Sequence, residues 1–386
     1  MKPLLVIAGE ASGDLHGAEL LRELKARQPE LRIIGIGGAG MTPYLDRKLA
    51  DVRDLGVVGF VEVLKHIPHL LRLKKEILRV AQEEGIGAAL LIDYQSFNLS
   101  LAKSLRKAMP TVRLHQYVCP QVWAWKAGRI PVLGRTLDTL YCLFDFEPRL
   151  FAGLPVEALW LGHPLVEVVK PEVDRETFFR ETGLDPARPL VALLPGSRPE
   201  EIQRLLPPMA ELAKTWRADP AHCQVQWVLP VAPTLDTRFV TAVLAGAPIT
   251  LVEGRSYAPR AYADAALVCS GTATLETALL GTPFAILYKL NAFTFRMAKH
   301  FVKLPHFGLA NVVAGRAVAP ELLQAEVNPA RLAQELSILL DPHHALRVRK
   351  DLAEVRSHLG EPGAAGRVAA HLLERVACVP LLINQG

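Results

Sequence analysis

Four short segments of this 386-residue chain place reactive or hydrogen-bonding side chains directly after apolar runs that are typical of β-strands. Two lie in the first half of the chain, around Ser12 and Asp93, and two lie in the second half, around Arg198 and Glu276. Ligands of open parallel sheets bind at the carboxyl ends of the strands, where such loops lie. These four loops are therefore where we expect the functional site.

The two loops of the first half carry the candidate acids. The loop GEASGD runs into a predicted helix and contains Glu10, Ser12 and Asp14. Asp14 acting only as a helix cap is an alternative, but a cap alone does not require three polar groups. Asp93 ends the run AALLID and precedes the segment YQSFN, which closes with Asn98. A carboxylate in this position is suited to act as a general base, although a lone aspartate at a strand end is often an N-cap.

Two tryptophans, Trp123 and Trp125, lie in the segment CPQVWAW after another apolar run. Their rings could stack on a sugar or an acyl chain, or they could pack between domains. The sequence does not decide between these roles.

The segment from Gly35 to Gly40 matches the dinucleotide-binding pattern G-x-G-x-x-G. It follows the second apolar run instead of the first, and the residues beyond it make a weak helix start. A structural glycine turn is the preferred interpretation, and an NAD site is the alternative.

The segment LPGSRPE in the second half closes a strand-like run and opens a predicted helix. Ser197 and Glu200 fit an S-x-x-E capping box, which gives the serine a structural role. Arg198 lies where an anion would meet the amino end of that helix. A solvated surface arginine is the alternative.

The segment SGTATLE, residues 270–276, also joins a strand-like run to a predicted helix. Its small residues would let a ligand reach free backbone N–H groups, and the helix dipole favours a diphosphate there. Glu276, about one turn into the helix, could accept hydrogen bonds from ribose hydroxyls. A capped helix with an acid in its first turn is the alternative.

These loops must be positioned by the elements between them. Continuous apolar runs alternate with amphipathic helical segments along both halves, which is typical of parallel strands covered on both faces. We predict an α/β protein of two Rossmann-like, doubly wound domains facing a cleft. The expected domains are 1–165 and 166–345, followed by helices at 346–386 that pack back or mediate a dimer contact.

Composition narrows the class of protein. Hydrophobic residues make up 50% and charged residues 22%, so each half can bury a full core. The five cysteines form no C-x-x-C pair, which favours a reducing compartment over a disulfide framework. The amino-terminal apolar run is too short for a signal peptide, and no uncharged run approaches a membrane span. A net charge of +5, spread along the chain, makes nucleic acid a weak hypothesis and an acidic small molecule or a membrane surface a better one.

Missing motifs narrow the chemistry. The chain has no G-x-x-x-x-G-K-[ST], no G-x-S-x-G and no H-E-x-x-H, which disfavours a P-loop nucleotidase, an α/β-hydrolase and a zincin. No D-x-D pair is present to hold a metal on a sugar diphosphate. We therefore expect no metal and no cofactor, with Arg198 and helix amino ends meeting the charge of a leaving diphosphate.

Two hydrophobic and basic stretches, 56–80 and 293–307, could lie at an anionic membrane interface. An amphipathic helix that faces a core explains each stretch equally well.

Taken together, the motifs resemble those of the lipid-A-disaccharide synthase family, inverting glycosyltransferases of GT-B architecture. The resemblance covers nearly the whole chain and is carried by AGEASGDLHG (8–17), GVVGFVEVL (56–64), YVCPQVWAW (117–125), ALLPGSR (192–198), CSGTATLE (269–276), FRMAKHFVK (295–303) and LANVVAGRAVAPELLQ (309–324). It implies metal-independent transfer of 2,3-diacylglucosamine from its UDP conjugate to 2,3-diacylglucosamine 1-phosphate. The product is a β-1,6-linked disaccharide, made at the cytoplasmic face of the inner membrane by a peripheral protein.

The resemblance also implies residue roles. The second half would bind UDP through Arg198, Thr272, Thr274, Glu276 and Asn311. The first half would hold the acyl-sugar acceptor, with Asp93 as the base for its 6-hydroxyl. Glu10, Ser12 and Asp14 would lie across the cleft from the donor; we count Glu10 and Ser12 with Asp93 as catalytic candidates, and Asp14, Asn98, Trp123 and Trp125 as substrate-binding ones. Members of the family can dimerise through their carboxyl-terminal parts.

One departure from the family affects the acceptor side. The family usually reads D-x-P-D-F-N where this chain has DYQSFN at 93–98, so the proline and the second acid are absent. A slower enzyme, another acceptor or a catalytically idle sugar-nucleotide-binding module would each fit this change. A UDP-sugar 2-epimerase, which shares the two-domain layout, is a further alternative.

Overall fold

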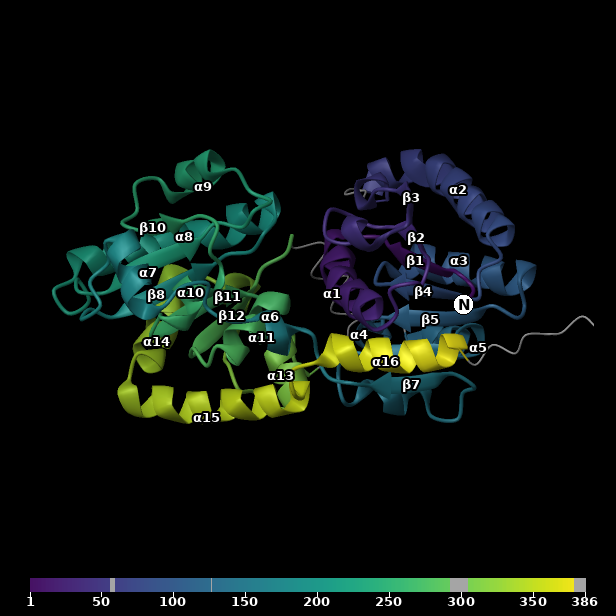
Figure 1. Cartoon of the computed structure of the whole chain (residues 1–386). Coiled ribbons are helices and arrows are strands. Elements are labelled where there is room, and N and C mark those ends of the chain that lie inside the picture. The colour runs from purple at the N-terminus through teal and green to yellow at the C-terminus, as the bar shows by residue number, and fades with distance from the viewer. Residues whose placement is uncertain (56–59, 126, 292–304, 378–386) are drawn as a thin grey trace, which may run out of the picture. The chain divides into compact units, whose positions relative to one another are not determined.

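The computed structural model describes residues 1–55, 60–125, 127–291 and 305–377. The chain forms two compact α/β units (Figure 1), one made of Met1–Pro164 with Glu361–Gly386 and the other of Leu165–Gly360. Each unit is built on one parallel sheet. The predicted fold class, two Rossmann-like doubly wound domains, is confirmed.

The first sheet has seven strands in the order β3-β2-β1-β4-β5-β6-β7. Its strands are β1 (Leu4–Ala8), β2 (Ile33–Ile36), β3 (Arg47–Ala50), β4 (Ala88–Ile92), β5 (Arg113–Tyr117), β6 (Thr139–Cys142) and β7 (Glu157–Trp160). Its longer helices are α1 (Ala11–Arg27), α2 (Phe60–Glu83), α3 (Gln95–Ala108), α5 (Ile130–Thr136) and α16 (Ala364–Ala377), and α4 (Val122–Trp125) is a single turn.

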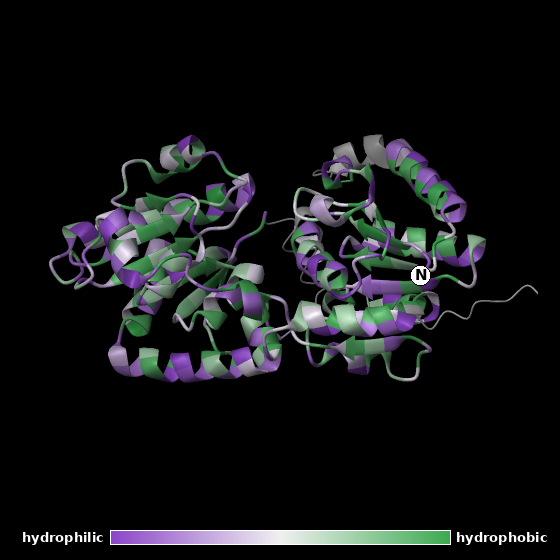
Figure 2. Cartoon of the chain, viewed as in Figure 1, coloured by the Kyte–Doolittle hydropathy of each residue, from purple (hydrophilic) through white to green (hydrophobic). Residues whose placement is uncertain are grey.

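Alternate residues of the central strands face two separate cores. Leu5 and Ile7 of β1 pack with α2, α3 and α5, whereas Leu4 and Val6 pack with α1 and α16. Burial on both faces explains why the runs are continuously apolar, as the hydrophobic strands in Figure 2 show.

The second sheet has six strands in the order β10-β9-β8-β11-β12-β13. They are β8 (Leu190–Leu194), β9 (Gln226–Pro230), β10 (Thr250–Val252), β11 (Ala265–Cys269), β12 (Phe284–Tyr288) and β13 (Glu321–Leu323). The helices of this unit are α6 (Leu165–Val168), α7 (Arg175–Thr182), α8 (Pro199–Ala218), α9 (Thr237–Leu244), α10 (Tyr257–Ala261), α11 (Thr272–Leu279), α13 (Leu309–Ala314), α14 (Pro329–Leu339) and α15 (Pro342–Leu359). One core lies between the sheet and α8, α9 and α14.

The carboxyl-terminal helices expected at 346–386 divide between the two units. Helix α15 lies in the second unit, while α16 returns to the first sheet and packs against α1. Arg367 of α16 fixes this return, because its guanidinium donates to the carbonyl oxygens of Leu161, Glu361 and Pro362 at 2.9, 2.7 and 2.7 Å.

Each of the two sheets has its own topological switch point. β1 and β4 are adjacent in the first sheet, and β8 and β11 are adjacent in the second, although neither pair is consecutive in sequence. The crossovers from such a pair leave in opposite directions, which opens a crevice at the carboxyl ends of the strands. All four loops singled out in the sequence follow these four strands.

Candidate active site

The switch point of the first sheet brings Ser12 and Asp93 together. Ser12 lies in the first turn of α1, after β1, and Asp93 follows β4. The Ser12 hydroxyl donates a hydrogen bond of 2.9 Å to Oδ2 of Asp93. Glu10 is exposed at the N-cap of α1, and its charge, after burial, is a cause of the raised pKa of Tyr94 beside Asp93. The three catalytic candidates therefore belong to one neighbourhood.

The backbone at Asp93 is held in an unusual conformation. Asp93 and Tyr94 have φ angles of 53° and 43°, in the left-handed region that side chains rarely adopt. Asn98, which is fully buried, donates from Nδ2 to the carbonyl oxygens of Asp93 at 2.8 Å and Ile92 at 3.1 Å. Gln116 adds a bond of 3.2 Å to the same Asp93 carbonyl. Strain that is fixed by neighbours in this way is typical of functional sites.

Asp93 is not the helix cap that the sequence left as an alternative. Helix α3 begins at Gln95, and its N-cap residue is Tyr94, which makes no side-chain cap bond. The Asp93 carboxylate instead accepts from its neighbour Tyr94 N at 2.9 Å and from Ser12. Asn98 donates hydrogen bonds to the backbone of this loop, so it stabilises the loop conformation that places Asp93.

His16 is a residue of this neighbourhood that the sequence analysis missed. It lies four residues after Ser12, so the two side chains share one face of α1. Burial lowers the pKa of His16, and the charge of Asp93 opposes that shift. The imidazole is therefore largely neutral near pH 7, next to the proposed base. The spacing of four residues from Ser12 in a predicted helix could have identified His16 from the sequence.

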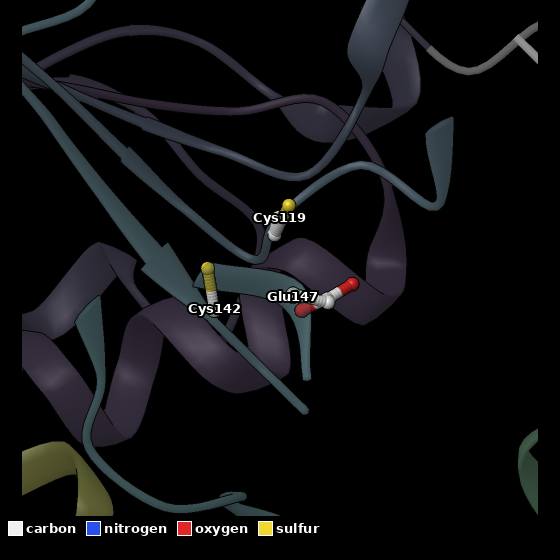
Figure 3. Close-up of side chains that lie close together, drawn as sticks. All are labelled: Cys119, Cys142 and Glu147. Carbon is white, nitrogen blue, oxygen red and sulfur yellow. The ribbon is translucent and has the colours of Figure 1, made fainter. Parts of the chain in front are cut away.

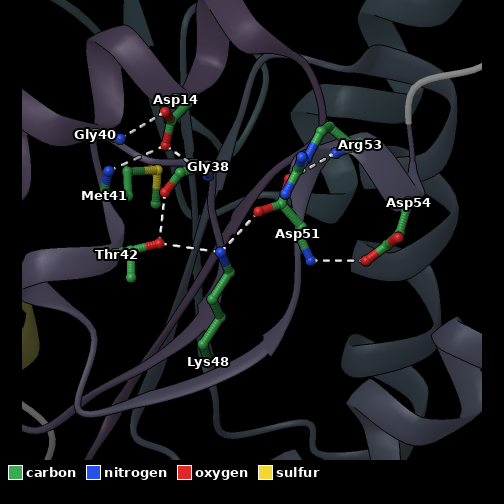
Figure 4. A network of polar contacts seen from close by, with 9 residues as sticks. All are labelled: Asp14, Gly38, Gly40, Met41, Thr42, Lys48, Asp51, Arg53 and Asp54. Atoms are coloured by element: carbon green, nitrogen blue, oxygen red, sulfur yellow. Dashed lines mark hydrogen bonds and ion pairs between the residues drawn. The ribbon is translucent and has the colours of Figure 1, made fainter.

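Asp14 has a different task from its neighbours (Figure 4). Its Oδ1 accepts from Gly38 N at 2.6 Å and Met41 N at 3.0 Å, and its Oδ2 accepts from Gly40 N at 2.9 Å. The N-cap of α1 is Glu10, so the interpretation of Asp14 as a helix cap is wrong. The same contacts occupy the amides that a dinucleotide would need in the G-x-G-x-x-G segment, which supports the structural interpretation of that segment.

Trp123 is held by a buried acid. Its indole Nε1 donates to Oε1 of Glu147 at 2.9 Å, and its ring packs edge-on against Phe144 and Phe146. The other Glu147 oxygen accepts from Leu143 N at 2.9 Å and Phe144 N at 3.1 Å. The indole N–H of Trp123 thus fixes the loop. The side chain of Trp125 lies outside the part of the chain that the structure describes.

Cys119, Cys142 and Glu147 lie close together (Figure 3), with one ligand atom of each within 4.8 Å of the others. All three side chains are buried. The hydrogen bond with Cys142 and then burial raise the pKa of the Cys119 thiol well above its ordinary value, so that in the absence of a metal this thiol keeps its proton. Both Glu147 oxygens already accept hydrogen bonds. We therefore interpret the cluster as packing that supports the Trp123 loop.

Glu147 makes the stability of the first unit depend on pH. Burial raises its pKa to about 7 from an ordinary 4.5, against hydrogen bonds that lower it. The folded state then binds the proton more tightly than the unfolded chain, and this tighter binding stabilises the fold. The stabilisation is fully present below pH 4.5 and is lost as the pH rises through about 7. From pH 5 to pH 8, the free energy of unfolding should fall by roughly 2–3 kcal/mol more in the wild type than in Glu147→Gln. Urea titrations at the two pH values measure this difference, and parallel pH dependences would contradict it.

The switch point of the second sheet holds a pocket of about 450 Å³. Its walls come from the loops after β8, β9 and β11 and from α10. Of the predicted donor-site residues, Arg198, Thr272 and Glu276 line it. The other lining residues are Leu194, Gly196, Ser197, Glu201, Pro230, Val231, Ala232, Pro233, Ser256, Arg260, Cys269, Ser270, Gly271 and Ala273.

The capping box predicted from Ser197 and Glu200 is wrong. Pro199 is the first residue of α8, which makes Arg198 the N-cap, and Glu201 reaches back to the loop. Its Oε2 accepts from Ser197 N at 2.9 Å and Arg198 N at 3.2 Å. The guanidinium of Arg198 remains exposed, 3.8 Å from the other Glu201 oxygen. The Arg198 side chain is 76% exposed, so an anion could reach it at this helix end.

Gly196 makes this arrangement possible. Its φ of 116° is unfavourable for other residues, and a Cβ there would lie 2.2 Å from Oε2 of Glu201. The glycine thus lets the loop turn back tightly over the carboxylate that holds it.

Two predicted donor contacts support the pocket without lining it. Thr274 is fully buried, and its hydroxyl donates to Gly271 O at 2.8 Å. Asn311 is also fully buried; its Oδ1 accepts from Val318 N and Ala319 N at 2.8 and 3.0 Å. Its Nδ2 donates to Ala319 O and Glu321 Oε1 at 2.9 and 2.7 Å. The structure brings Thr272 to the pocket surface but keeps these two side chains inside the fold.

The two stretches considered for lipid contact are only partly described. In 56–80, helix α2 turns Ile77 and Val80 into the core, which fits the amphipathic-helix alternative, while Leu71 is 55% exposed. Residues 292–304, most of the second stretch, lie outside the described residues. Among the helices that the structure describes, none is long and apolar enough to cross a membrane.

Comparison with known proteins gives one consistent family. Residues 4–370 match the family model described as lipid-A-disaccharide synthetase. The chain is 42% identical over 375 residues to a lipid-A-disaccharide synthase of Anaeromyxobacter dehalogenans, covering 96% of both chains. It is also 42% identical to that of Myxococcus xanthus, covering 96% of this chain and 97% of the relative.

Solved structures with the same fold are more distant in sequence. A UDP-N-acetylglucosamine 2-epimerase from Listeria monocytogenes, named as putative in its description, superposes with a TM-score of 0.66 at 14% identity, covering 98% of this chain and 97% of that one. The calicheamicin glycosyltransferase gives 0.60 at 14% identity, covering 98% and 99%. At these identities the likeness establishes the two-domain fold alone.

Proposed function

This chain belongs to the lipid-A-disaccharide synthase family of glycosyltransferases, and from that premise we propose the reaction in detail. The donor is UDP-2,3-diacylglucosamine and the acceptor is 2,3-diacylglucosamine 1-phosphate. The acceptor 6-hydroxyl loses its proton to Asp93 as its oxygen attacks the anomeric carbon, and the bond from that carbon to UDP breaks. Attack from the side opposite the leaving group inverts the anomeric centre and gives the β-1,6-linked disaccharide.

The pocket of the second unit supports the donor assignment. It combines an exposed guanidinium, Arg198, with the amino end of α11 at Thr272 and an acid, Glu276. The first two can meet the negative charge of a diphosphate, and the acid can accept from ribose hydroxyls. We propose that these groups stabilise departing UDP without a metal ion.

The hydrogen bond between Ser12 and Asp93 is the observation that best supports the acceptor assignment. It holds the carboxylate at the carboxyl end of β4, within a loop whose backbone is strained. The departure from the family pattern falls on the first turn of α3, where Gln95 replaces proline at the first helical position and Ser96 is exposed. The Asp93 contacts do not depend on either replaced side chain.

We further propose that the protein works at the inner face of the cell membrane, because both substrates carry acyl chains. It would lie on the surface as a peripheral protein, and a homodimer through the carboxyl-terminal part is compatible with the family.

The decisive experiment supplies both acyl-sugar substrates in EDTA and follows the release of UDP. Release that requires the acceptor and survives chelation is expected. Release without acceptor would favour epimerase-type chemistry, and UDP binding without any release would favour an idle binding module. Loss of activity in EDTA that returns with a divalent metal would overturn the metal-independent mechanism.

Replacing Arg198 by alanine should weaken the binding of UDP about tenfold, because a charge-assisted hydrogen bond to a phosphate is lost at an exposed position. Calorimetric titration of UDP measures the change. The matched control is Arg217→Ala, an exposed arginine in the last turn of the same helix. Equal UDP affinity of Arg198→Ala and wild type would remove Arg198 from the donor site.

A further inference from the structure

The donor pocket contains a buried arginine that the sequence analysis did not identify. Arg260 lies on α10, and its residue surface is only 8% exposed. It lines the pocket together with Ser256 and Glu276. An arginine is rarely buried unless it is paired, so its partners indicate its role.

The Arg260 guanidinium is shared between two pocket residues. Its Nη1 forms a close ion pair with Oε2 of Glu276, and its Nη2 donates to the Ser256 hydroxyl at 2.7 Å. Its Nε is buried and finds no hydrogen-bond acceptor among the residues that the structure describes. The planar guanidinium therefore points one edge at the carboxylate that we assign to the ribose.

Tyr257 holds the other oxygen of the same carboxylate. Its hydroxyl donates to Oε1 of Glu276 at 3.3 Å. Burial, followed by the charge of Glu276, raises the pKa of Tyr257 to about 12, so the hydroxyl keeps its proton. The bond to Tyr257 is long, and each carboxylate oxygen has a second lone pair. Glu276 can therefore accept from a ligand hydroxyl while it stays held in place.

Helix α10 is itself anchored. Glu172 accepts from Ser256 N, Tyr257 N and Ala258 N at 2.8, 3.0 and 2.8 Å. At the other end, the Thr282 hydroxyl donates to Arg260 O at 2.7 Å. The short helix thus presents Arg260 and Tyr257 from a fixed backbone.

We propose that Arg260 is a positioning residue for nucleotide recognition, which holds the Glu276 carboxylate oriented to accept from the ribose hydroxyls of a nucleoside diphosphate. This inference rests on the proposed donor site and adds the group that makes it selective for ribonucleotides. Without this partner the Glu276 carboxylate would rotate toward Tyr257, which donates to its other oxygen. Its oxygens would then no longer be placed to accept from a ligand hydroxyl.

The test compares UDP with 2′-deoxy-UDP by calorimetric titration of the full chain. We expect the wild type to prefer UDP about tenfold or more, because a site that bonds a hydroxyl discriminates against a ligand lacking it. Arg260→Met should reduce this ratio to about one, mainly by weakening UDP, and Arg260→Lys should give an intermediate ratio. Arg198→Ala should weaken both ligands and leave their ratio unchanged.

Controls separate this role from folding and from the donor assignment. Arg255→Met removes a neighbouring arginine that pairs with Glu181 and does not line the pocket, so it should leave the ratio unchanged. If Arg260→Met does not fold, Arg260→Lys and Tyr257→Phe are measured in its place. A wild-type preference for UDP over 2′-deoxy-UDP in both of these variants would overturn the proposal. An unchanged ratio in folded Arg260→Met, or equal weakening of both ligands, would also overturn it. Wild-type protein that binds neither ligand would overturn the donor site itself.

Discussion

Asp93→Asn is expected to lower the rate of acyl-sugar transfer about 100- to 10,000-fold, the range that loss of a general base produces. Asparagine has the same shape: its Oδ1 can still accept from Tyr94 N, and its Nδ2, in the place of Oδ2, can donate to the Ser12 hydroxyl oxygen. It cannot accept the proton of the acceptor hydroxyl. The fold and the strained loop should therefore persist while the chemical step is lost.

Steady-state and single-turnover rates of UDP release, measured beside UDP affinity, check this expectation. Affinity for UDP should be unchanged, because the donor pocket lies wholly in the second unit. Ser12→Ala is the graded comparison: it removes one hydrogen bond from Asp93 and should slow transfer only about fivefold. A variant Asp93→Asn with wild-type turnover would remove Asp93 from the role of base.

Gly35→Ala is expected to lower the free energy of unfolding of the first unit by about 4 kcal/mol or more, which is exceptionally large for a single substitution. Gly35 lies in β2 and pairs with Val6 of β1. A Cβ at this position would lie 1.8 Å from the Val6 carbonyl oxygen. This oxygen belongs to the backbone of a central strand, so it cannot move aside without breaking the pairing of the sheet.

Equilibrium urea unfolding followed by circular dichroism measures this effect, and UDP binding reports separately on the second unit. The matched control is Gly128→Ala, because a Cβ at Gly128 meets no atom within 4 Å and the residue is exposed. That change should be neutral or slightly stabilising. Equal stability of the two variants would show that the β1–β2 pairing tolerates a side chain at residue 35.

The Gly35 contact also shows what a glycine pattern conveys. The segment from Gly35 to Gly40 matches a dinucleotide-binding pattern, but the structure gives Gly35, Gly38 and Gly40 roles within the fold. Gly35 allows a close backbone approach, and Gly38 and Gly40 donate their amides to Asp14. Spacing alone cannot distinguish a loop that binds phosphate from one that binds a carboxylate of its own chain.

The sequence by itself determined the α/β class, the two parallel sheets and the loops that bear the candidate site. It could do so because buried parallel strands are read as continuous apolar runs, and because ligand-binding loops follow such runs at their carboxyl ends. The motifs also identified the family, since long ordered segments such as GEASGD and SGTATLE rarely recur together.

Only the tertiary structure decided which polar side chains are available to a ligand. Ser12 and Asp93 are 81 residues apart, and strand order makes them partners. The family resemblance implies that Thr274 and Asn311 contact the donor, whereas in the structure both side chains are buried and hydrogen-bonded within the fold. Arg260 carries no motif, and it becomes significant because α10 brings it to Glu276. Hydrogen-bond partners depend on which strands and helices become neighbours, and local sequence patterns do not contain that information.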